Sequence, residues 1–355
     1  MANRRNLDSA HKGKKDEFYT QYEDVEREVN AYLDYDKDTF KDKVVLCPCD
    51  DPEWSSFTRY FAQNFKKLGL KKLITTSFAN DSKFEDIRVE PSEYEKTSPN
   101  FDPEKTFTHG KVFILERKSD GSCDVDMSDL HWNYLEEDGD FRSEEGRRLR
   151  DEADIIVTNP PFSLFREFVA WLMEANKKFL ILGNQNAISY KEIYPLLMDG
   201  KMWIGCRFNE RVNGKNLTYR VPDFYEMNAC ELYQDSNGDK YITVPGTGWF
   251  TNLDHGRRHQ PLSLMSMDDN IKYSKHPAIK GQPYRKYDNC DAIDVPFVDS
   301  IPSDYDGLMG VPVTFFGKFC PEQFELVRFR KGDDGKDLCI NGTPTYFRVL
   351  IRRKQ

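Results

Sequence analysis

Short apolar runs alternate with longer segments of helical periodicity through the first 250 residues, and this pattern most constrains the fold. The apolar runs have the length of buried strands and lie at 43–47, 72–76, 154–158, 178–182 and 202–206. The segments with helical spacing lie at 55–68, 164–175 and 191–198. Because strands joined by crossover helices produce such alternation, the sequence predicts a Rossmann-like, doubly wound parallel α/β sheet.

The pattern changes after Gly246. One more apolar run, at 249–253, precedes a stretch in which Pro, Gly and Tyr are frequent and helical periodicity nearly ends. Asn341-Gly342 lies between two apolar runs, as expected of a two-residue hairpin turn. The acidic segment 80–140 also predicts one hairpin, starting with a strand at 111–116. We therefore expect a basic arm at 1–15, an α/β domain at 16–254 and a mixed, β-rich region at 255–355.

Composition excludes several protein classes. No segment approaches the roughly 18 consecutive apolar residues that a membrane helix needs, and the basic N-terminus lacks the apolar core of a secretory signal. The eight cysteines are scattered without a disulfide-like spacing, as expected of reduced thiols in the cytoplasm. Neither a phosphate-binding P-loop nor a Gly-x-Ser-x-Gly motif is present, so hydrolase and NTPase chemistry has no support.

The net charge of −9 is unevenly distributed along the chain. Residues 201–290 carry 13 Lys and Arg against 10 Asp and Glu, whereas residues 1–200 carry 29 against 40. Phosphate binding depends on local positive surfaces rather than on total charge, so a nucleic-acid partner is compatible with an acidic chain. Charge alone does not separate such a partner from ordinary solvated surface.

Asn159-Pro160-Pro161-Phe162 directly follows the predicted strand at 154–158 and is the most informative motif. Two prolines end the strand rigidly and leave backbone carbonyls free to accept hydrogen bonds. The Asn159 side chain adds an oxygen acceptor, and Phe162 adds a flat surface for stacking. Together these groups can hold the amino group of a planar ring, and ligands of such sheets bind at this edge. The alternative is a simple strand-ending turn with an apolar anchor.

The motif and further segments resemble, in the same order and from about residue 12 to 353, the EcoRI-type adenine-specific DNA methyltransferases. The matching segments are 16–20, 45–52, 139–143, 154–166, 310–314 and 321–325. The resemblance implies an enzyme that transfers a methyl group from S-adenosyl-L-methionine to N6 of an adenine flipped out of double-stranded DNA. It also implies that 16–254 is the catalytic domain and that 255–355 recognises the DNA target.

The resemblance implies a set of catalytic and cofactor-binding residues. Asn159, Pro160, Pro161 and Phe162 would hold the target adenine, with Asn159 also beside the cofactor. The remaining cofactor residues would be Phe18, Tyr19, Thr20, Asp50, Asp51, Asp140 and Phe141. Among them, Asp140 and Phe141 would receive the cofactor adenine, and the carboxylates after the first strand would meet its ammonium or ribose. The usual glycine-rich turn is missing there, and Thr75-Thr76-Ser77 ends the second strand without an acidic residue.

Basic residues in three segments are candidates for DNA contact, because Arg can clamp a phosphate or bond a guanine edge. These candidates are Arg4, Arg5, Lys14, Lys15, Arg211, Lys215, Arg257, Arg258 and His259. Solubilising surface charge is the alternative. No metal site is expected, because Cys47-Pro48-Cys49 has no second pair. The spacing of His255 and His259 favours a phosphate-contacting or surface loop.

Two alternative functions remain compatible with the sequence. The Asn-Pro-Pro-aromatic motif would equally hold cytosine N4, an RNA adenine or a protein glutamine. A DNA-binding regulator without methyl transfer is the other alternative, and the glycine-free first loop favours it. We expect a monomer without membrane attachment. A restriction endonuclease that shares its site is a candidate partner, and the sequence does not show whether one exists.

Overall fold

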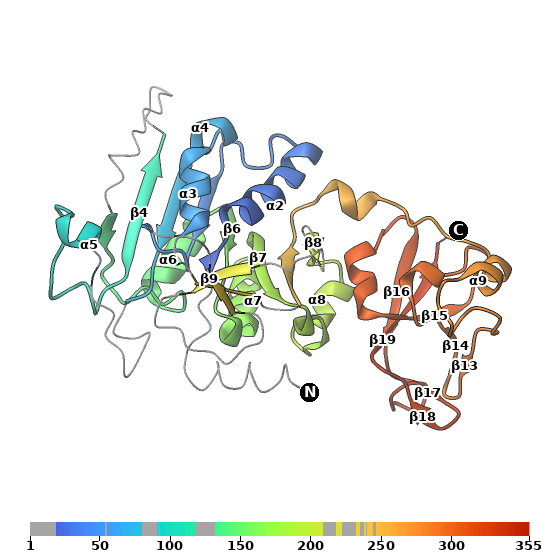
Figure 1. Ribbon diagram of the computed structural model, residues 1–355. Helices are drawn as coiled ribbons and strands as arrows, with labels where there is room; N and C mark the ends of the chain where they lie inside the picture. The colour runs from blue at the N-terminus through green and yellow to red at the C-terminus, as the bar shows by residue number, and fades with distance from the viewer. Residues whose placement is uncertain are drawn as a thin grey trace. The chain divides into compact units, whose positions relative to one another are not determined.

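A computed structural model of the chain describes residues 19–53, 55–79, 91, 93–117, 132–208, 218–221, 232–234, 238, 240–243 and 246–354. The chain forms two compact units (Figure 1). Unit 1 contains 1–193 and 207–253, and unit 2 contains Tyr194–Cys206 and Asp254–Gln355. Unit 2 therefore includes a segment from the middle of the chain.

Unit 1 is built on seven strands of an eight-stranded sheet with the order β5-β4-β3-β2-β6-β7-β12-β8. The edge strand β8 begins in the segment Tyr194–Cys206 of unit 2. The strands are β2 (Val44–Cys47), β3 (Lys72–Thr76), β4 (Lys111–Glu116), β5 (Trp132–Tyr134), β6 (Ile155–Thr158), β7 (Lys178–Asn184), β8 (Trp203–Phe208) and β12 (Thr247–Thr251). The predicted α/β fold is confirmed. The sheet is mixed, because β4, β5 and β12 run antiparallel to their neighbours β3, β4 and β7.

The central strands β3, β2, β6 and β7 are mutually parallel, so they end at one edge of the sheet. Every residue of β2 and β6 is buried, as expected for strands that helices cover on both faces. The second strand of the hairpin predicted at 111–125 lies outside the described residues. In the structure, β4 pairs with β3 and β5.

Helices form where apolar side chains recur on one face and where caps mark the ends. Ser55 accepts a hydrogen bond from the Phe57 N–H at the start of α3, and Gly69 ends α4 with a left-handed φ of 64°. The helices of unit 1 are α2 (Tyr22–Tyr35), α3 (Ser56–Gln63), α4 (Phe65–Leu68), α5 (Glu93–Thr97), η3 (Phe162–Leu164), α6 (Glu144–Glu152), α7 (Phe165–Glu174) and η4 (Gln185–Ser189). In Figure 1, α2, α3 and α4 group together, while α6 and α7 form a separate group.

A second sheet in unit 1 has the order β1-β9-β11-β10. Its strands are β1 (Tyr19–Thr20), β9 (Thr218–Val221), β10 (Leu232–Gln234) and β11 (Lys240–Thr243). The pairing of β1 with β9 places Thr20 opposite Tyr219. The sheet thus joins the N-terminal part of the chain to a segment two hundred residues later.

Unit 2 is mostly β-structure, with the sheet order β13-β14-β15-β19-β16. Its strands are β13 (Lys286–Tyr287), β14 (Cys290–Asp294), β15 (Leu308–Pro312), β16 (Phe324–Phe329) and β19 (Arg348–Arg353), with a separate hairpin of β17 (Cys339–Ile340) and β18 (Thr343–Pro344). Its helices are α8 (Tyr194–Met198), η5 (Gly256–His259), α9 (Met267–Tyr273), η6 (Val298–Ser300) and η7 (Val313–Lys318). The predicted hairpin turn is confirmed, since Asn341 and Gly342 both have positive φ.

Within the described ranges, the structure contains no helix with the length and apolar character that crossing a membrane requires.

Candidate active site

Asn159-Pro160-Pro161-Phe162 occupies the edge at which the parallel strands end. Asn159 directly follows β6 and is half-buried, Pro160 is buried, and Phe162 is half-buried at the start of η3. The Leu164 N–H donates to the Pro161 carbonyl over 2.9 Å, so the loop turns at once into a helix. The prolines cannot extend the β ladder, and this tight turn fixes the direction in which the motif leaves the sheet.

Asp50 lies at the same edge, directly after the loop that ends β2. Its two carboxylate oxygens accept hydrogen bonds of 2.6 Å from the hydroxyls of Ser55 and Thr158. Burial raises the pKa of Asp50 to about 7, although the two hydroxyl donors oppose this shift. The side chain predicted to meet the cofactor is thus bonded within the protein to the residue that precedes Asn159.

A buried ionic cluster beside this edge was not anticipated from the sequence. Lys111 begins β4, and its Nζ lies 2.9 Å from Glu95 and 3.7 Å from Glu53. Burial disfavours the charge of Lys111, but the carboxylates of Asp51, Glu53 and Glu95 raise its pKa overall. Asp51 is half-buried, and its Oδ1 accepts from the Glu53 N–H over 2.8 Å. The sequence feature that could have indicated this cluster is Lys111, a lysine at the start of an otherwise apolar strand.

An apolar pocket opens where β2 and β3 end. Its lining includes Leu46, Pro48, Thr76, Leu135, Gly139 and Phe141. The backbones of Gly110 and Gly139 approach the Ser77 carbonyl so closely that a Cβ would lie 2.4 Å and 2.2 Å from its oxygen. Of these two, Gly139 lines the pocket, at a position with φ of 85° that favours glycine.

Asp140 and Phe141 have different roles in the structure. Phe141 is buried, lines the pocket and packs against Phe168 at 5.0 Å between ring centroids. The Asp140 carboxylate forms an ion pair with Arg142 at 2.6 Å. Burial raises the pKa of Asp140, but its hydrogen bonds to Arg142 lower it overall.

Several residues predicted to bind the cofactor or DNA lie outside the described ranges or at their edge. Tyr19 and Thr20 form β1, and Thr20 is buried. The residues that lie outside the described ranges are Phe18, Arg4, Arg5, Lys14, Lys15, Arg211 and Lys215.

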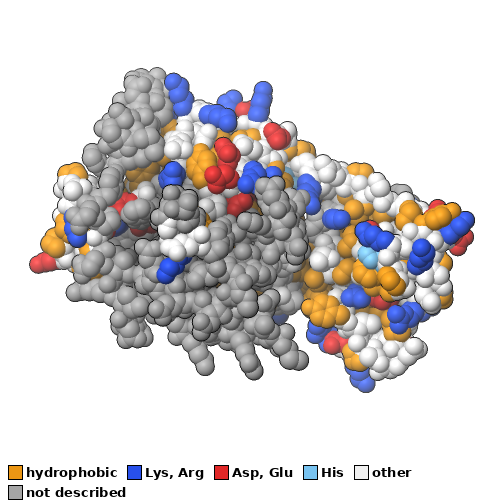
Figure 2. Space-filling view, viewed as in Figure 1, with side chains coloured by type: hydrophobic (Ala, Val, Ile, Leu, Met, Phe, Trp, Pro, Cys, Tyr) orange, Lys and Arg blue, Asp and Glu red, His pale blue; other side chains and the backbone are white. Residues whose placement is uncertain are grey.

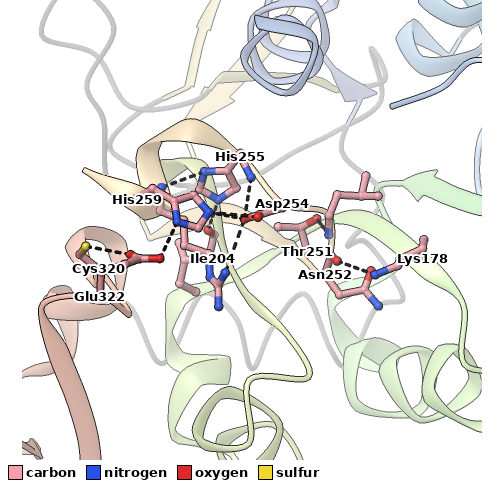
Figure 3. Close-up of polar contacts among 11 residues, drawn as sticks. Lys178, Ile204, Thr251, Asn252, Asp254, His255, His259, Cys320 and Glu322 are labelled. Carbon is pink, nitrogen blue, oxygen red and sulfur yellow. Dashed lines mark hydrogen bonds and ion pairs between the residues drawn. The ribbon is translucent and has the colours of Figure 1, made fainter. Parts of the chain in front are cut away.

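The basic segment Gly256–His259 of unit 2 forms η5, and polar contacts hold it in place (Figure 3). His255 is buried, and its Nδ1 accepts from the Arg258 N–H over 3.3 Å. Its Nε2 consequently donates to the Ile204 carbonyl over 3.0 Å. Burial lowers the pKa of His255 to about 4, so the ring is neutral near pH 7. It acts as a structural bridge between two segments of unit 2.

Arg258 and His259 also contact other groups in unit 2. The Arg258 guanidinium lies 4.1 Å from the Trp203 ring centroid, and its side chain is 19% exposed. His259 bonds Asp254 at 2.9 Å and Glu322 at 2.8 Å, and these carboxylates raise its pKa. Figure 2 shows Lys and Arg side chains spread among hydrophobic ones on the visible face of unit 2.

Comparison with known proteins identifies the family. The model of the family described as adenine-specific methyltransferase EcoRI matches residues 6–354. The chain belongs to this EcoRI methylase family. It is 44% identical over 98% of its length to the Type II methyltransferase M.EcoRI of Escherichia coli, of which it covers 96%. No solved structure matches the chain.

More distant members of the EcoRI methylase family also align along nearly the whole chain. The Type II methyltransferases M.MgeORF184P of Mycoplasma genitalium and M.MpnI of Mycoplasma pneumoniae are each 32% identical over 98% of it. The alignments cover 98% and 97% of those proteins. The expected family and enzyme class are confirmed: the chain is an adenine-specific methyltransferase.

Proposed function

We propose that this methyltransferase transfers a methyl group from S-adenosyl-L-methionine to N6 of an adenine that has left the stack of double-stranded DNA. The observation that carries the proposal is the position of Asn159-Pro160-Pro161-Phe162, directly after β6 at the edge where four parallel strands end. Ligands of open α/β sheets bind at this edge. A base inside a duplex cannot reach such an edge unless it is flipped out.

The chemistry assigned to the motif follows from its donors and acceptors. The Asn159 side-chain oxygen and the Pro160 carbonyl would accept hydrogen bonds from the N6 amino group, and Phe162 would stack on the base. This arrangement directs the nitrogen lone pair toward the methyl donor, so positioning and electrostatics account for the acceleration. A dedicated general base is not needed, because the N6 proton becomes acidic once the nitrogen is methylated.

The residues around the pocket of β2 and β3 fit S-adenosyl-L-methionine, which supplies a methyl group activated on a sulfonium. Phe141, which lines this pocket, gives an apolar surface for a flat adenine ring. Asp51, which is half-buried, is the candidate for the polar part of the cofactor. The other residues that we propose to contact the cofactor are Thr20 in β1, Asn159, Phe18, Tyr19 and Asp140.

We assign DNA recognition to unit 2 and to the basic segments of the chain. The proposed contacts in unit 2 are Arg257, Arg258 and His259, although each also bonds or stacks within the protein. The remaining proposed contacts are Arg4, Arg5, Lys14, Lys15, Arg211 and Lys215. We also propose that the enzyme acts as a monomer in the cytoplasm and shares its site with a restriction endonuclease.

One experiment tests the proposed function most directly. The protein is incubated with methyl-labelled S-adenosyl-L-methionine and a mixed pool of duplex DNA, and the labelled sites are sequenced. We expect N6-methyladenine within one short sequence. Parallel reactions contain the same sequences as RNA, and a protein extract. Label on cytosine N4, on RNA or on protein would replace the proposal with that acceptor, and binding of the cofactor without any transfer would indicate a regulator.

A further inference from the structure

The ends of three neighbouring strands meet at a single residue, Asp50. Its N–H donates to the Thr76 carbonyl at the end of β3 over 2.9 Å. Its Oδ2 accepts from the Thr158 hydroxyl at the end of β6, and its Oδ1 accepts from Ser55 at the start of α3, both at 2.6 Å. One side chain and its own N–H thus connect β2, β3, β6 and the first helix after β2.

These contacts are enclosed by protein. Asp50 is 5% exposed, Thr158 is fully buried, and Ser55 is 6% exposed. A carboxylate in this position has little surface left to offer to a ligand that arrives from solvent. Hydrogen bonds of 2.6 Å are at the short end of the range for O–H···O contacts, so Asp50 holds the strand ends firmly.

The contact bears directly on the catalytic motif, because Thr158 immediately precedes Asn159. A shift of the Thr158 backbone would move the Asn159 amide relative to the base. A misplacement of about 1 Å costs on the order of 100-fold in rate. By contrast, Phe141 and Leu135 of the pocket lining lie on other segments of the chain than Thr158.

We propose that Asp50 is a positioning residue, which fixes the Asn159 loop through the Thr158 hydroxyl and does not bind the cofactor itself. This inference rests on the proposed function of the Asn159 motif. It corrects the role that the sequence suggested for Asp50 and leaves Asp51 as the carboxylate of this loop that faces the cofactor.

The test uses the full-length protein and three substitutions. Thr158→Val removes the hydroxyl at nearly constant volume, Thr158→Ser restores it, and Asp50→Asn replaces one acceptor with a donor. We expect Thr158→Val and Asp50→Asn each to lower kcat about 10- to 100-fold. Thr158→Ser should return to within a few-fold of the wild type. The affinity for S-adenosyl-L-methionine, measured by calorimetry without DNA, should change less than about threefold.

Thr251→Val is the matched control. Thr251 is a fully buried threonine of the same sheet, and its hydroxyl donates to the Phe179 carbonyl over 2.7 Å. This variant should lose stability as Thr158→Val does while keeping the wild-type kcat. If both threonine variants lower kcat equally, Thr158 acts only through general stability and the proposal is overturned.

Two other results overturn the proposal. A more than tenfold loss of cofactor affinity in Asp50→Asn, with kcat retained at saturating cofactor, would make Asp50 a cofactor ligand. Equal kcat values for Thr158→Val and Thr158→Ser would show that the hydroxyl does not position the loop, and this pair decides even if Asp50→Asn fails to fold. If the wild type methylates an acceptor other than DNA adenine, the proposed function fails, but the same comparison on that acceptor still decides the role of Asp50.

Discussion

At the scale of single residues, the candidate site contains both enclosed side chains and partly accessible ones. Asp50 is buried and bonded to neighbouring protein groups. Asn159 and Phe162 remain half-buried at the end of β6. Residues that are partly accessible at a strand end are the ones that a substrate can reach.

Asn159→Ala should abolish turnover while leaving cofactor affinity within several-fold. The loss of one positioned hydrogen-bonding group typically costs on the order of 10²–10³ in rate. Single-turnover methylation of a cognate duplex gives the rate, and calorimetry gives the affinity. Near wild-type methylation by this variant would remove Asn159 from the reaction. Phe162→Trp, which keeps an aromatic surface, is the matched control and should retain activity.

Arg258→Ala tests whether a predicted DNA contact reads bases. The guanidinium lies over Trp203 at 4.1 Å, so its removal should lower the stability of unit 2 by about 0.5–2 kcal/mol. Because this cation is held against the protein, we expect binding to weaken alike on a cognate and a one-base-changed duplex. Titrations of both duplexes check this result. A selective loss on the cognate duplex, worth roughly 1–3 kcal/mol, would instead identify Arg258 as a base-reading residue.

At the scale of elements, the loop η5 carries a pH-dependent contact. The pKa of His259 is raised by hydrogen bonds to Asp254 and Glu322, so the folded state binds this proton more tightly than the unfolded state. The stabilisation is therefore complete below the ordinary histidine pKa of 6.5 and is lost as pH rises through the folded value. His259 is 28% exposed, which screens the interaction and keeps it small.

His259→Gln should consequently destabilise the protein more at pH 5.5 than at pH 8.5. Thermal unfolding of the variant and the wild type at both pH values measures the difference. His109→Gln serves as the control, because the His109 ring contacts the neutral hydroxyl of Thr108. A destabilisation by His259→Gln that is the same at both pH values would show that the charge of His259 makes no contribution.

Local patterns in the sequence predicted the elements well. The strand at 72–76 has the bounds of β3, and the helical segment predicted at 55–68 forms α3 and α4 and ends with α4 at Leu68. The direction of β4 and β12 was not predictable, since an apolar run reads the same in a parallel and an antiparallel strand. The hydrogen bond of Asp50 joins it to Thr158, which lies 108 residues further along the chain. Spacing along the sequence contains no information about such a contact.

At the scale of the whole molecule, an acidic protein must bind DNA through a few positive segments. Deletion of residues 1–12 removes Arg4, Arg5 and Lys12 from the chain. We expect weaker DNA binding and a shallower dependence on salt, since each lost phosphate contact lowers the slope by about one. Binding titrations between 50 and 200 mM salt, a range in which phosphate contacts show clearly, measure this slope. An unchanged slope would exclude the arm from the interface.

The two units also set the order in which the chain can fold during synthesis. The segment Tyr194–Cys206 belongs to unit 2, but the loop that bonds to it lies about fifty residues later, as the separation of 51 between Ile204 and His255 shows. At about 5–20 residues per second, a ribosome releases His255 several seconds after Ile204. During most of this interval its neighbour in the sheet, β12, has not yet been synthesised, so β8 has no strand to pair with. A translational pause between these two residues would lengthen the time for which β8 lacks its neighbour β12, and a fragment that ends before Thr247 would lack that neighbour altogether.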